Sequence, residues 1–166
     1  STPLYSSAAS DVYKRQVLGK GILMQIETVA KEGFLPVRVH PTDAGADLRA
    51  DIPEPVTLQP RESTFFNTGI EVAIPEGYFG ALAIRSSLAC KHGLMLANSL
   101  GIIDSCYRGP VKAKLVNIGR RPYTINPGDR IAQLLIIPCV HAAFIQVDEL
   151  PESDRGTGGF GSTGAQ

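Results

Sequence analysis

The chain has 166 residues, of which 43% are apolar and 19% charged, a size and composition typical of one domain with a sizeable core. Sixteen basic side chains balance sixteen acidic ones, so no excess positive charge exists to hold a nucleic acid polymer or an anionic membrane surface. The longest clear apolar run, Leu134 to Pro138, is far too short to span a membrane. We expect a cytoplasmic protein with neither partner, whose cysteines are reduced thiols: Cys90, Cys106 and Cys139.

The N-terminal segment Ser1 to Leu23 precedes a plausible initiator, Met24, and shows neither strand alternation nor a helical apolar stripe. A signal peptide is the alternative interpretation, but its basic residues, Lys14 and Arg15, would come late and no long apolar stretch follows them. We therefore expect residues 1–23 to be a non-native or disordered leader and residues 24–150 to form the domain.

Short apolar runs interrupted by proline or glycine follow one another from Leu35 onward, a pattern typical of strands. In the run VKAKLV (111–116) the apolar side chains alternate with two lysines, so the former are expected to face a core and the lysines to face water. Proline and glycine predict tight turns at residues 75–77 and 126–129. Many short strands at this spacing favour an all-β sandwich or closed barrel.

One short helix is expected from Ser86 to His92, with Ser86 or Ser87 as its N-cap and Gly93 ending it. Arg85, Ser86 and Ser87 directly follow the expected strand YFGALAI. A guanidinium, two hydroxyls and helix N–H groups would then point at one place, as in an anion site. An exposed arginine beside a helix cap is the plainer alternative.

Asp104 stands in the run GIIDSCYRG, where Gly101 and Gly109 are expected to mark the ends of a hairpin. A carboxylate there can orient a water molecule or hold a metal ion. An aspartate that bonds its own turn backbone is the more common situation. Both interpretations stay open at this point.

The C-terminus changes character after Leu150, because RGTGGFGSTG is rich in glycine and almost empty of core-forming residues. Its backbone amides can fold around phosphate oxygens while Phe160 stacks on a base, which would make residues 151–166 a lid that also carries Arg155. A flexible tail is the alternative. The run does not match a P-loop, since no Lys-Ser or Lys-Thr pair closes it.

Five segments taken in order resemble the five motifs of the trimeric dUTPases: AGADLRA, RSSLACKHG, NSLGIIDSCYRG, RIAQLLIIP and RGTGGFGSTG. The resemblance covers nearly all of residues 24–166. It implies an all-β subunit with a jelly-roll or β-barrel-like fold, one short helix and a flexible glycine-rich C-terminal arm. It also implies a homotrimer whose sites are each assembled from three chains, and Mg2+-assisted hydrolysis of dUTP to dUMP and pyrophosphate.

The catalytic role implied by the resemblance falls on Asp104, which would hold and activate the water that attacks the α-phosphorus. Asp47, in AGADLRA, would contact the water shell of a Mg2+ held mainly by the three phosphates. Polar residues of the second and fourth motifs would contact the phosphates: Arg85, Ser86, Ser87 and Gln133. The arm of another chain would close over the triphosphate with Arg155, Gly161, Ser162 and Thr163.

Uracil would lie in the segment Asn98 to Tyr107, according to the same resemblance. Asn98 and the backbone of Gly101 and Ile103 would reproduce a base-pair edge and leave no room for a 5-methyl group. Tyr107 would pack beneath the deoxyribose and collide with a 2′-hydroxyl. Phe160 would stack on the uracil face when the arm closes.

The chain departs from the family's pattern at four positions: Ile84 for a usual proline, Ser87 for a common glycine, Cys106 for a frequent acidic residue and Pro110 for a frequent glutamate. Ser87 leaves open a dCTP deaminase of the same fold, because the deaminases also carry Arg-Ser-Ser. A deaminase needs a catalytic glutamate at the position where this chain has Lys114. The deaminases also lack the closing GGFGSTG that this chain carries. A non-catalytic nucleotide-binding module is the other alternative.

Overall fold

The computed structural model describes residues 24–154, 156 and 157, and the expected leader lies outside them. That part of the chain forms eleven strands and one α-helix. Their bounds are β1 Glu27–Ala30, β2 Ala46–Arg49, β3 Val56–Leu58, β4 Ser63–Asn67, β5 Ile70–Ala73, β6 Tyr78–Ile84, α2 Ser86–His92, β7 Leu94–Leu96, β8 Gly101–Ile103, β9 Lys112–Asn117, β10 Tyr123–Ile125 and β11 Arg130–Pro138.

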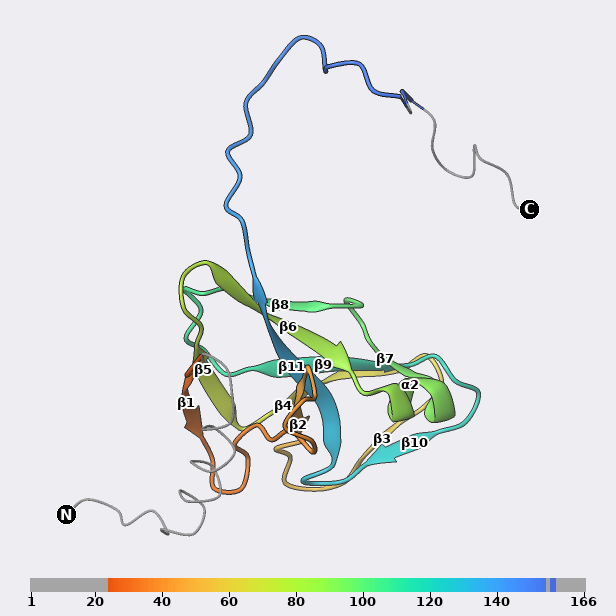
Figure 1. Cartoon of the computed structure of the whole chain (residues 1–166). Coiled ribbons are helices and arrows are strands. Elements are labelled where there is room, and N and C mark those ends of the chain that lie inside the picture. The colour runs from red at the N-terminus through yellow and green to blue at the C-terminus, as the bar shows by residue number, and fades with distance from the viewer. Residues whose placement is uncertain (1–23, 155, 158–166) are drawn as a thin grey trace, which may run out of the picture.

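The strands pair in an antiparallel manner throughout, in four sheets ordered β1–β5, β10–β3, β4–β9–β7 and β2–β11–β6–β8. The sheets surround a common interior, and α2 stands at one end beside β7 and β10 (Figure 1). Short strands and a single short helix confirm the all-β, barrel-like fold. No helix in the described ranges has both the length and the apolar character that crossing a membrane requires.

The core is built from large side chains of seven strands, all of them essentially inaccessible to water: Leu48, Leu58, Phe66, Leu94, Leu96, Leu115, Ile125 and Ile131. Two polar side chains are buried with them and both are bonded. The Thr68 hydroxyl donates to the Val111 carbonyl at 2.7 Å, and Asn117 Nδ2 donates to Leu58 and Arg121 carbonyls at 2.9 and 2.8 Å. Their burial therefore leaves no polar group unsatisfied.

The alternation expected in VKAKLV is present, with Val111, Ala113 and Leu115 buried and Lys112 exposed. Lys114 differs, because it is half-buried and its ammonium lies 5.2 Å from the centroid of the Phe65 ring. Both predicted turns form, closed by Tyr78 N–H to the Pro75 carbonyl and by Asp129 N–H to the Asn126 carbonyl.

Helix α2 has the predicted bounds, but the prediction of a serine N-cap is wrong. The N-cap is Arg85, in extended conformation at φ −73 and ψ 133, and no side chain caps the helix. Since β6 continues extended up to Arg85, Ser86 and Ser87 already lie within the first turn. At the other end Gly93 adopts a left-handed conformation at φ 67, and its N–H donates to the Ala89 carbonyl.

The hairpin expected between Gly101 and Gly109 is also wrong. β8 pairs with β6 of one sheet, whereas β9 pairs with β4 and β7 of another. The chain from Asp104 to Pro110 therefore crosses between sheets. Its turn is held by Tyr107 N–H donating to the Asp104 carbonyl at 3.0 Å, and by Arg108 Nη1 donating to the Ser105 carbonyl at 2.6 Å.

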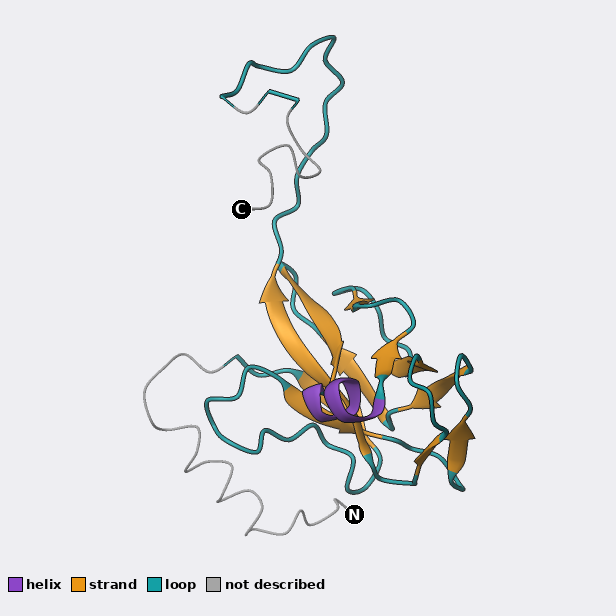
Figure 2. Ribbon diagram, turned by 90° about the vertical axis from the view of Figure 1, so that its right-hand side faces the viewer, coloured by secondary structure: helices purple, strands orange, loops and turns teal. Residues whose placement is uncertain are grey.

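Residues 140–154 extend away from the barrel as an exposed segment without strands or helices (Figures 1 and 2). Just before it, Cys139 N–H donates to the Gly77 carbonyl at 2.8 Å. Large apolar side chains are 82 to 97% exposed along it: Val140, Phe144, Ile145 and Leu150. A soluble chain seldom leaves so many apolar side chains in water unless a partner covers them.

Candidate active site

β11 is the central strand that aligns the first, second and fourth motifs. Its register places Gln133 opposite Asp47 of β2 on one side and opposite Ala83 of β6 on the other. Residues directly opposite each other on neighbouring strands project to the same face of a sheet. Asp47 and Gln133 therefore share a face, and Arg85, two residues beyond Ala83, stands at its edge.

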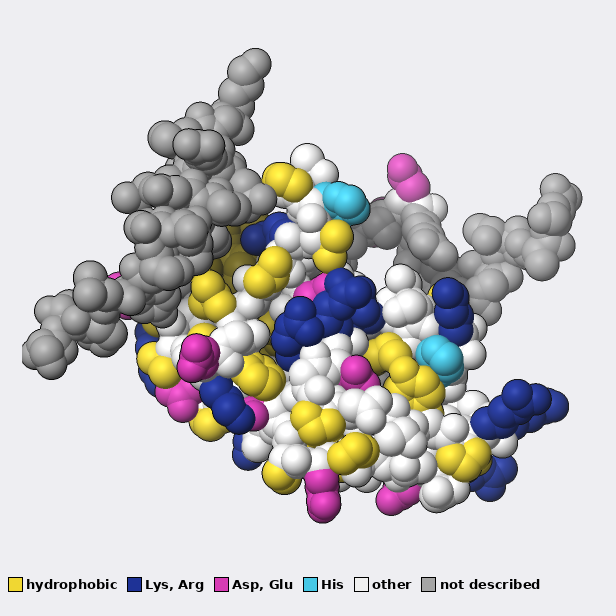
Figure 3. Space-filling view, turned by 90° about the horizontal axis from the view of Figure 1, so that it is seen from below, with side chains coloured by type: hydrophobic (Ala, Val, Ile, Leu, Met, Phe, Trp, Pro, Cys, Tyr) yellow, Lys and Arg dark blue, Asp and Glu magenta, His cyan; other side chains and the backbone are white. Residues whose placement is uncertain are grey.

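The carboxylate of Asp47 holds two arginines at this edge. Arg85 Nε lies 2.8 Å from its Oδ1, and Arg130 Nη1 lies 2.9 Å from its Oδ2. The carboxylate is largely buried and the two guanidinium groups are partly exposed. Seen from below, basic side chains gather near the middle of the face, beside acidic ones (Figure 3). Such a cluster has donors to spare for an anion.

Arg130 was missed by the sequence analysis, which assigned a role only to Gln133 in RIAQLLIIP. The pairing of β11 with β2 shifts register between Arg130 and Ala132, as at a β-bulge. The extra residue lets Ile131 and Ala132 both be buried and leaves Arg130 free to reach Asp47. The sequence signal was an arginine immediately before two consecutive apolar residues at the start of a strand.

Gln133 lies against a position without a side chain. Its Nε2 donates to the Ile84 carbonyl at 3.3 Å, one residue before Arg85. A Cβ at Gly45 would come within 2.5 Å of Gln133 Oε1, which is far inside contact distance. The glycine of AGADLRA thus admits the Gln133 amide between β2 and β6.

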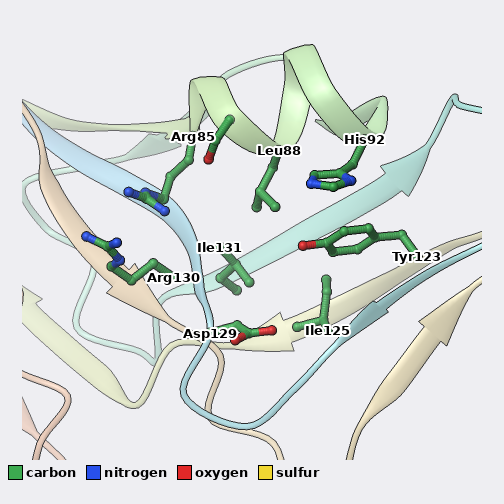
Figure 4. A pocket seen from close by; sticks show the side chains of 9 residues that line it. Arg85, Leu88, His92, Tyr123, Ile125, Asp129, Arg130 and Ile131 are labelled. Atoms are coloured by element: carbon green, nitrogen blue, oxygen red, sulfur yellow. The ribbon is translucent and has the colours of Figure 1, made fainter.

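A pocket of about 250 Å³ opens between α2 and the turn that joins β10 to β11 (Figure 4). Arg85, Ser87 and Arg130 line it, whereas Ser86 is exposed on α2. His92 and Tyr123 also line the pocket, with their ring centroids 4.5 Å apart. Burial, together with the carboxylate of Asp129, raises the pKa of the Tyr123 hydroxyl above its usual value.

Asp104 lies at the far end of β8 and is exposed. In the part of the chain that the structure describes, its carboxylate has no hydrogen-bond or ion-pair partner; the turn uses its backbone carbonyl instead. Asp43 and Asp129 behave differently, because their carboxylates accept turn N–H groups at 2.8 Å. The interpretation of Asp104 as a turn-bonding aspartate therefore has no support, and the carboxylate is available to water or substrate.

The residues expected to bind uracil flank β6 along β8, which is the edge strand of its sheet. Gly101 and Ile103 are buried and pair with Leu82 and Gly80, so the Ile103 side chain belongs to the core and only backbone is left for a ligand. An edge strand keeps unpaired N–H and C=O groups along its outer side. Asn98 is exposed in the turn before β8, and Tyr107 is 44% exposed after it.

Asp104 and Arg85 lie at opposite ends of β6. Asp104 follows Ile103, the partner of Gly80, whereas Arg85 comes after the last residue of β6. At roughly 3.3 Å per residue, Asp104 and Arg85 are therefore separated by about 20 Å along the direction of β6. A single subunit therefore does not bring the expected catalytic carboxylate to the expected phosphate contacts. The arm residues lie outside the described residues: Arg155, Phe160, Gly161, Ser162 and Thr163.

Comparison with known proteins defines the family. A model of the family described as dUTPase matches residues 31–164. The chain is similar to the deoxyuridine 5′-triphosphate nucleotidohydrolase of Leifsonia xyli subsp. xyli, with 49% identity over 85% of this chain and 91% of the relative. The relative in Chlamydia pneumoniae with the same description is 48% identical over 80% of this chain and 92% of its own length. The chain belongs to the dUTPase family.

Solved structures agree with this assignment. A Staphylococcus bacteriophage 80alpha dUTPase variant with dUpNHpp aligns with a TM-score of 0.76 and 30% identity, covering 85% of this chain and 99% of the phage chain. The dUTPase of phage phi11 of S. aureus aligns with a TM-score of 0.69 and 29% identity, over 76% of this chain and 98% of its own.

Proposed function

We propose that this protein hydrolyses dUTP to dUMP and pyrophosphate, which keeps uracil out of DNA and supplies dUMP for dTMP synthesis. The relatives are named for this reaction, and the phage enzyme that the fold matches was solved with dUpNHpp. The observation that carries the proposal is a free, exposed carboxylate at Asp104 together with a cluster of anion-binding donors at Arg85, Arg130 and Gln133, within this family.

Asp104 acts as the general base. Its carboxylate is exposed and has no partner among the described residues, so both oxygens can accept hydrogen bonds from a water molecule. Holding that water against the α-phosphorus and taking its proton as the O–P bond forms is the usual contribution of a positioned carboxylate. The bond to the bridging oxygen then breaks, and pyrophosphate leaves.

Arg85, Ser86, Ser87 and Gln133 bind the phosphates, with Arg130 as a further guanidinium beside them. The negative charge that develops on the leaving pyrophosphate is neutralised by fixed guanidinium groups, which do not have to reorganise during the reaction. Asp47 keeps Arg85 and Arg130 apart and oriented through its two oxygens. The arm brings Arg155, Gly161, Ser162 and Thr163 over the triphosphate, and Phe160 over the uracil.

Mg2+ fits this donor set as an ion carried by the substrate. Among the residues the structure describes, no three of the side chains His, Cys, Asp and Glu gather as a metal cage, so its oxygen ligands would come mainly from the three phosphates and water. A carboxylate accepts about four hydrogen bonds, and Asp47 accepts one from Arg130 while it pairs with Arg85, so it can still hold metal-bound water. When bound, Mg2+ supplies further neutralisation of phosphate charge.

The proposed assembly is a homotrimer, and two features of the subunit support sites that are shared between chains. The catalytic and phosphate-binding halves stand about 20 Å apart along β6, so each half is completed by a neighbour. The exposed apolar segment 140–150 then packs on another subunit and carries the arm, residues 151–166, to a site away from its own domain, residues 24–150.

Free thiols at all three cysteines fit the reducing cytoplasm.

A dCTP deaminase on the same fold is disfavoured by the position aligned with its catalytic glutamate. Lys114 stands there in β9, with its ammonium over the Phe65 ring, and the position offers no carboxylate. A non-catalytic binding module would have no need of the unpaired carboxylate at Asp104.

The purified protein should be incubated with dUTP, dCTP, dTTP and UTP, with and without Mg2+, while pyrophosphate and ammonia are both measured. We expect pyrophosphate from dUTP in the presence of Mg2+ and no ammonia from dCTP. Ammonia release would identify the deaminase, and binding without turnover of any nucleotide would identify the binding module.

The shared site is tested by mixing subunits. Asp104→Asn and Arg85→Ala subunits, each nearly inactive alone, should be unfolded together, refolded and compared with the separately refolded proteins. If sites combine Asp104 of one chain with Arg85 of another, some sites in mixed trimers are intact and activity returns. Verified mixed trimers without activity would place both residues of each site in one chain.

A further inference from the structure

The ring of Tyr107 lies directly against Gly109. A Cβ built on Gly109 would be 2.5 Å from Tyr107 Oη, 2.8 Å from Cζ and 3.2 Å from Cε2, whereas ordinary contact begins at 3.4 Å. The hydroxyl at the end of the ring donates to the Pro110 carbonyl at 3.1 Å. The ring is thus bounded on one side by the bare Cα of Gly109 and tethered at its tip by the residue that follows.

The backbone of Gly109 gives no other reason for glycine at this position. Its φ is not among the positive values recorded for Gly33, Gly69, Gly77, Gly93, Gly128 and Gly156, so an L-amino acid can adopt its conformation without strain. The three atoms nearest to a Cβ at position 109 all belong to the Tyr107 ring and its hydroxyl. The requirement for a hydrogen atom here therefore comes from that ring.

We propose that Gly109 is a positioning residue for Tyr107 and thereby sets the selectivity of the enzyme for deoxyribose over ribose. The inference rests on the proposed function, in which Tyr107 packs beneath the sugar. Excluding a 2′-hydroxyl by collision requires a surface that does not retreat, since a ring free to swing would make room for the hydroxyl. Gly109 and the Pro110 carbonyl define the place in which the ring is held.

The rest of the turn fixes the backbone from which the ring projects. Tyr107 N–H donates to the Asp104 carbonyl, and Arg108 Nη1 donates to the carbonyls of Ser105 and Tyr107. The catalytic carboxylate and the sugar contact are consequently parts of one short turn. The freedom of the Tyr107 side chain is limited by its contact with Gly109 and by its hydrogen bond to the Pro110 carbonyl.

Gly109→Ala is the direct test. The tip of Tyr107 must move by about 1 Å to restore contact distance, which breaks its bond to the Pro110 carbonyl, while little stability is lost because the displaced atoms end an exposed side chain. We expect the ratio of kcat/KM for dUTP to kcat/KM for UTP to fall at least about tenfold, the usual effect of one misplaced pocket contact. A ratio within about twofold of the parent's, in a folded protein, would overturn the inference.

A double-mutant cycle separates an effect through the ring from a general disturbance of the turn. Tyr107→Ala removes the ring, so adding Gly109→Ala to it should leave the dUTP/UTP ratio unchanged. Equal effects of Gly109→Ala with and without the ring would show that residue 109 acts through the backbone and would overturn the proposal. Should Gly109→Ala not fold, Tyr107→Phe removes the tether alone and should still lower the ratio, by about three- to tenfold for one hydrogen bond; an unchanged ratio there would also overturn it.

A failure of the proposed function would give other results than a failure of the role of Gly109. If the parent protein does not hydrolyse dUTP, or hydrolyses UTP equally well, the assignment of Tyr107 to the sugar is itself wrong. If the parent discriminates and Tyr107→Ala loses that discrimination while Gly109→Ala keeps it, only the role of Gly109 is refuted.

Discussion

Arg85 Nε lies 2.8 Å from Oδ1 of Asp47, so that a guanidinium at the end of β6 forms an ion pair with a carboxylate of β2. The other carboxylate oxygen takes Arg130. We predict that Asp47→Asn raises KM for dUTP about tenfold or more, because the negative charge that pairs with both arginines of the proposed phosphate site is lost. Asp51→Asn is the matched control, since Asp51 pairs with Lys31 at the surface, where an ion pair matters little. Equal KM values in both variants would contradict this role.

Asp104→Asn should lower kcat by roughly two to four orders of magnitude, the range for a positioned acid or base. Binding of dUTP and thermal stability should hardly change, because the described structure shows no partner that the carboxylate would lose. Asp43→Ala serves as the control for stability, since the Asp43 carboxylate accepts the His40 N–H and the loss of this acceptor should lower Tm. Single-turnover kinetics and calorimetric binding would separate the two effects, and a near-normal kcat would remove Asp104 from the mechanism.

Gly45→Ala should act through Gln133. The added Cβ would meet the Gln133 amide oxygen at 2.5 Å and push it away from the Ile84 carbonyl. We expect kcat/KM for dUTP to fall about tenfold, the scale of a single misplaced phosphate contact. Adding Gly45→Ala to Gln133→Ala should then cost nothing more, and additive losses would show that position 45 acts through β2 instead.

Truncation after Pro151 removes Arg155, Phe160, Ser162 and Thr163 but hardly any apolar surface. The domain should still fold and assemble with an unchanged Tm. If the arm closes over the triphosphate, the loss of a charge-assisted contact, a stacking face and the exclusion of water should lower kcat/KM at least about a hundredfold. A fully active truncated protein would leave the arm as a flexible appendage.

Stability at alkaline pH should depend on Tyr123. Burial, with the Asp129 carboxylate, raises the pKa of its hydroxyl in the folded protein, so the folded state retains the proton after the unfolded state has released it. This contribution to stability is complete below the unfolded pKa of 10.0 and is lost as pH rises through the folded value. Tyr123→Phe should flatten the fall in Tm above about pH 10, and an unchanged slope would refute the assignment.

Features that depend on local residue order were predicted well from the sequence. The helix from Ser86 to His92, its end at Gly93, both proline-glycine turns and the inward face of VKAKLV all depend on neighbours within a few positions. The serine cap failed because the chain stays extended through Arg85, directly after the pairing of β6 with β11 ends at Ile84. The hairpin failed for a similar reason, since β8 finds its partner in β6 rather than in the next strand.

In the candidate site, too, some residues were predicted from the sequence and others depend on how distant segments pair. The family resemblance placed Asp47, Arg85 and Gln133 in one site, and the β2–β11–β6 register brings these residues together. Arg130 was missed because its role depends on a bulge, and a bulge is a property of two paired strands rather than of one sequence segment. The contact of Gly109 with Tyr107 likewise depends on how one side chain folds back over a turn.

On the proposed mechanism, the length of β6 makes the specific activity depend on protein concentration. With the proposed water-activating carboxylate at one end and the proposed phosphate donors at the other, an isolated subunit would contain both groups and complete no site. Specific activity on the proposed assembly should therefore fall on dilution below the dissociation constant of the subunits, although each chain stays folded. A compound that covers the apolar side chains of residues 140–150 would inhibit by the same route, and raising the substrate concentration would not reverse it.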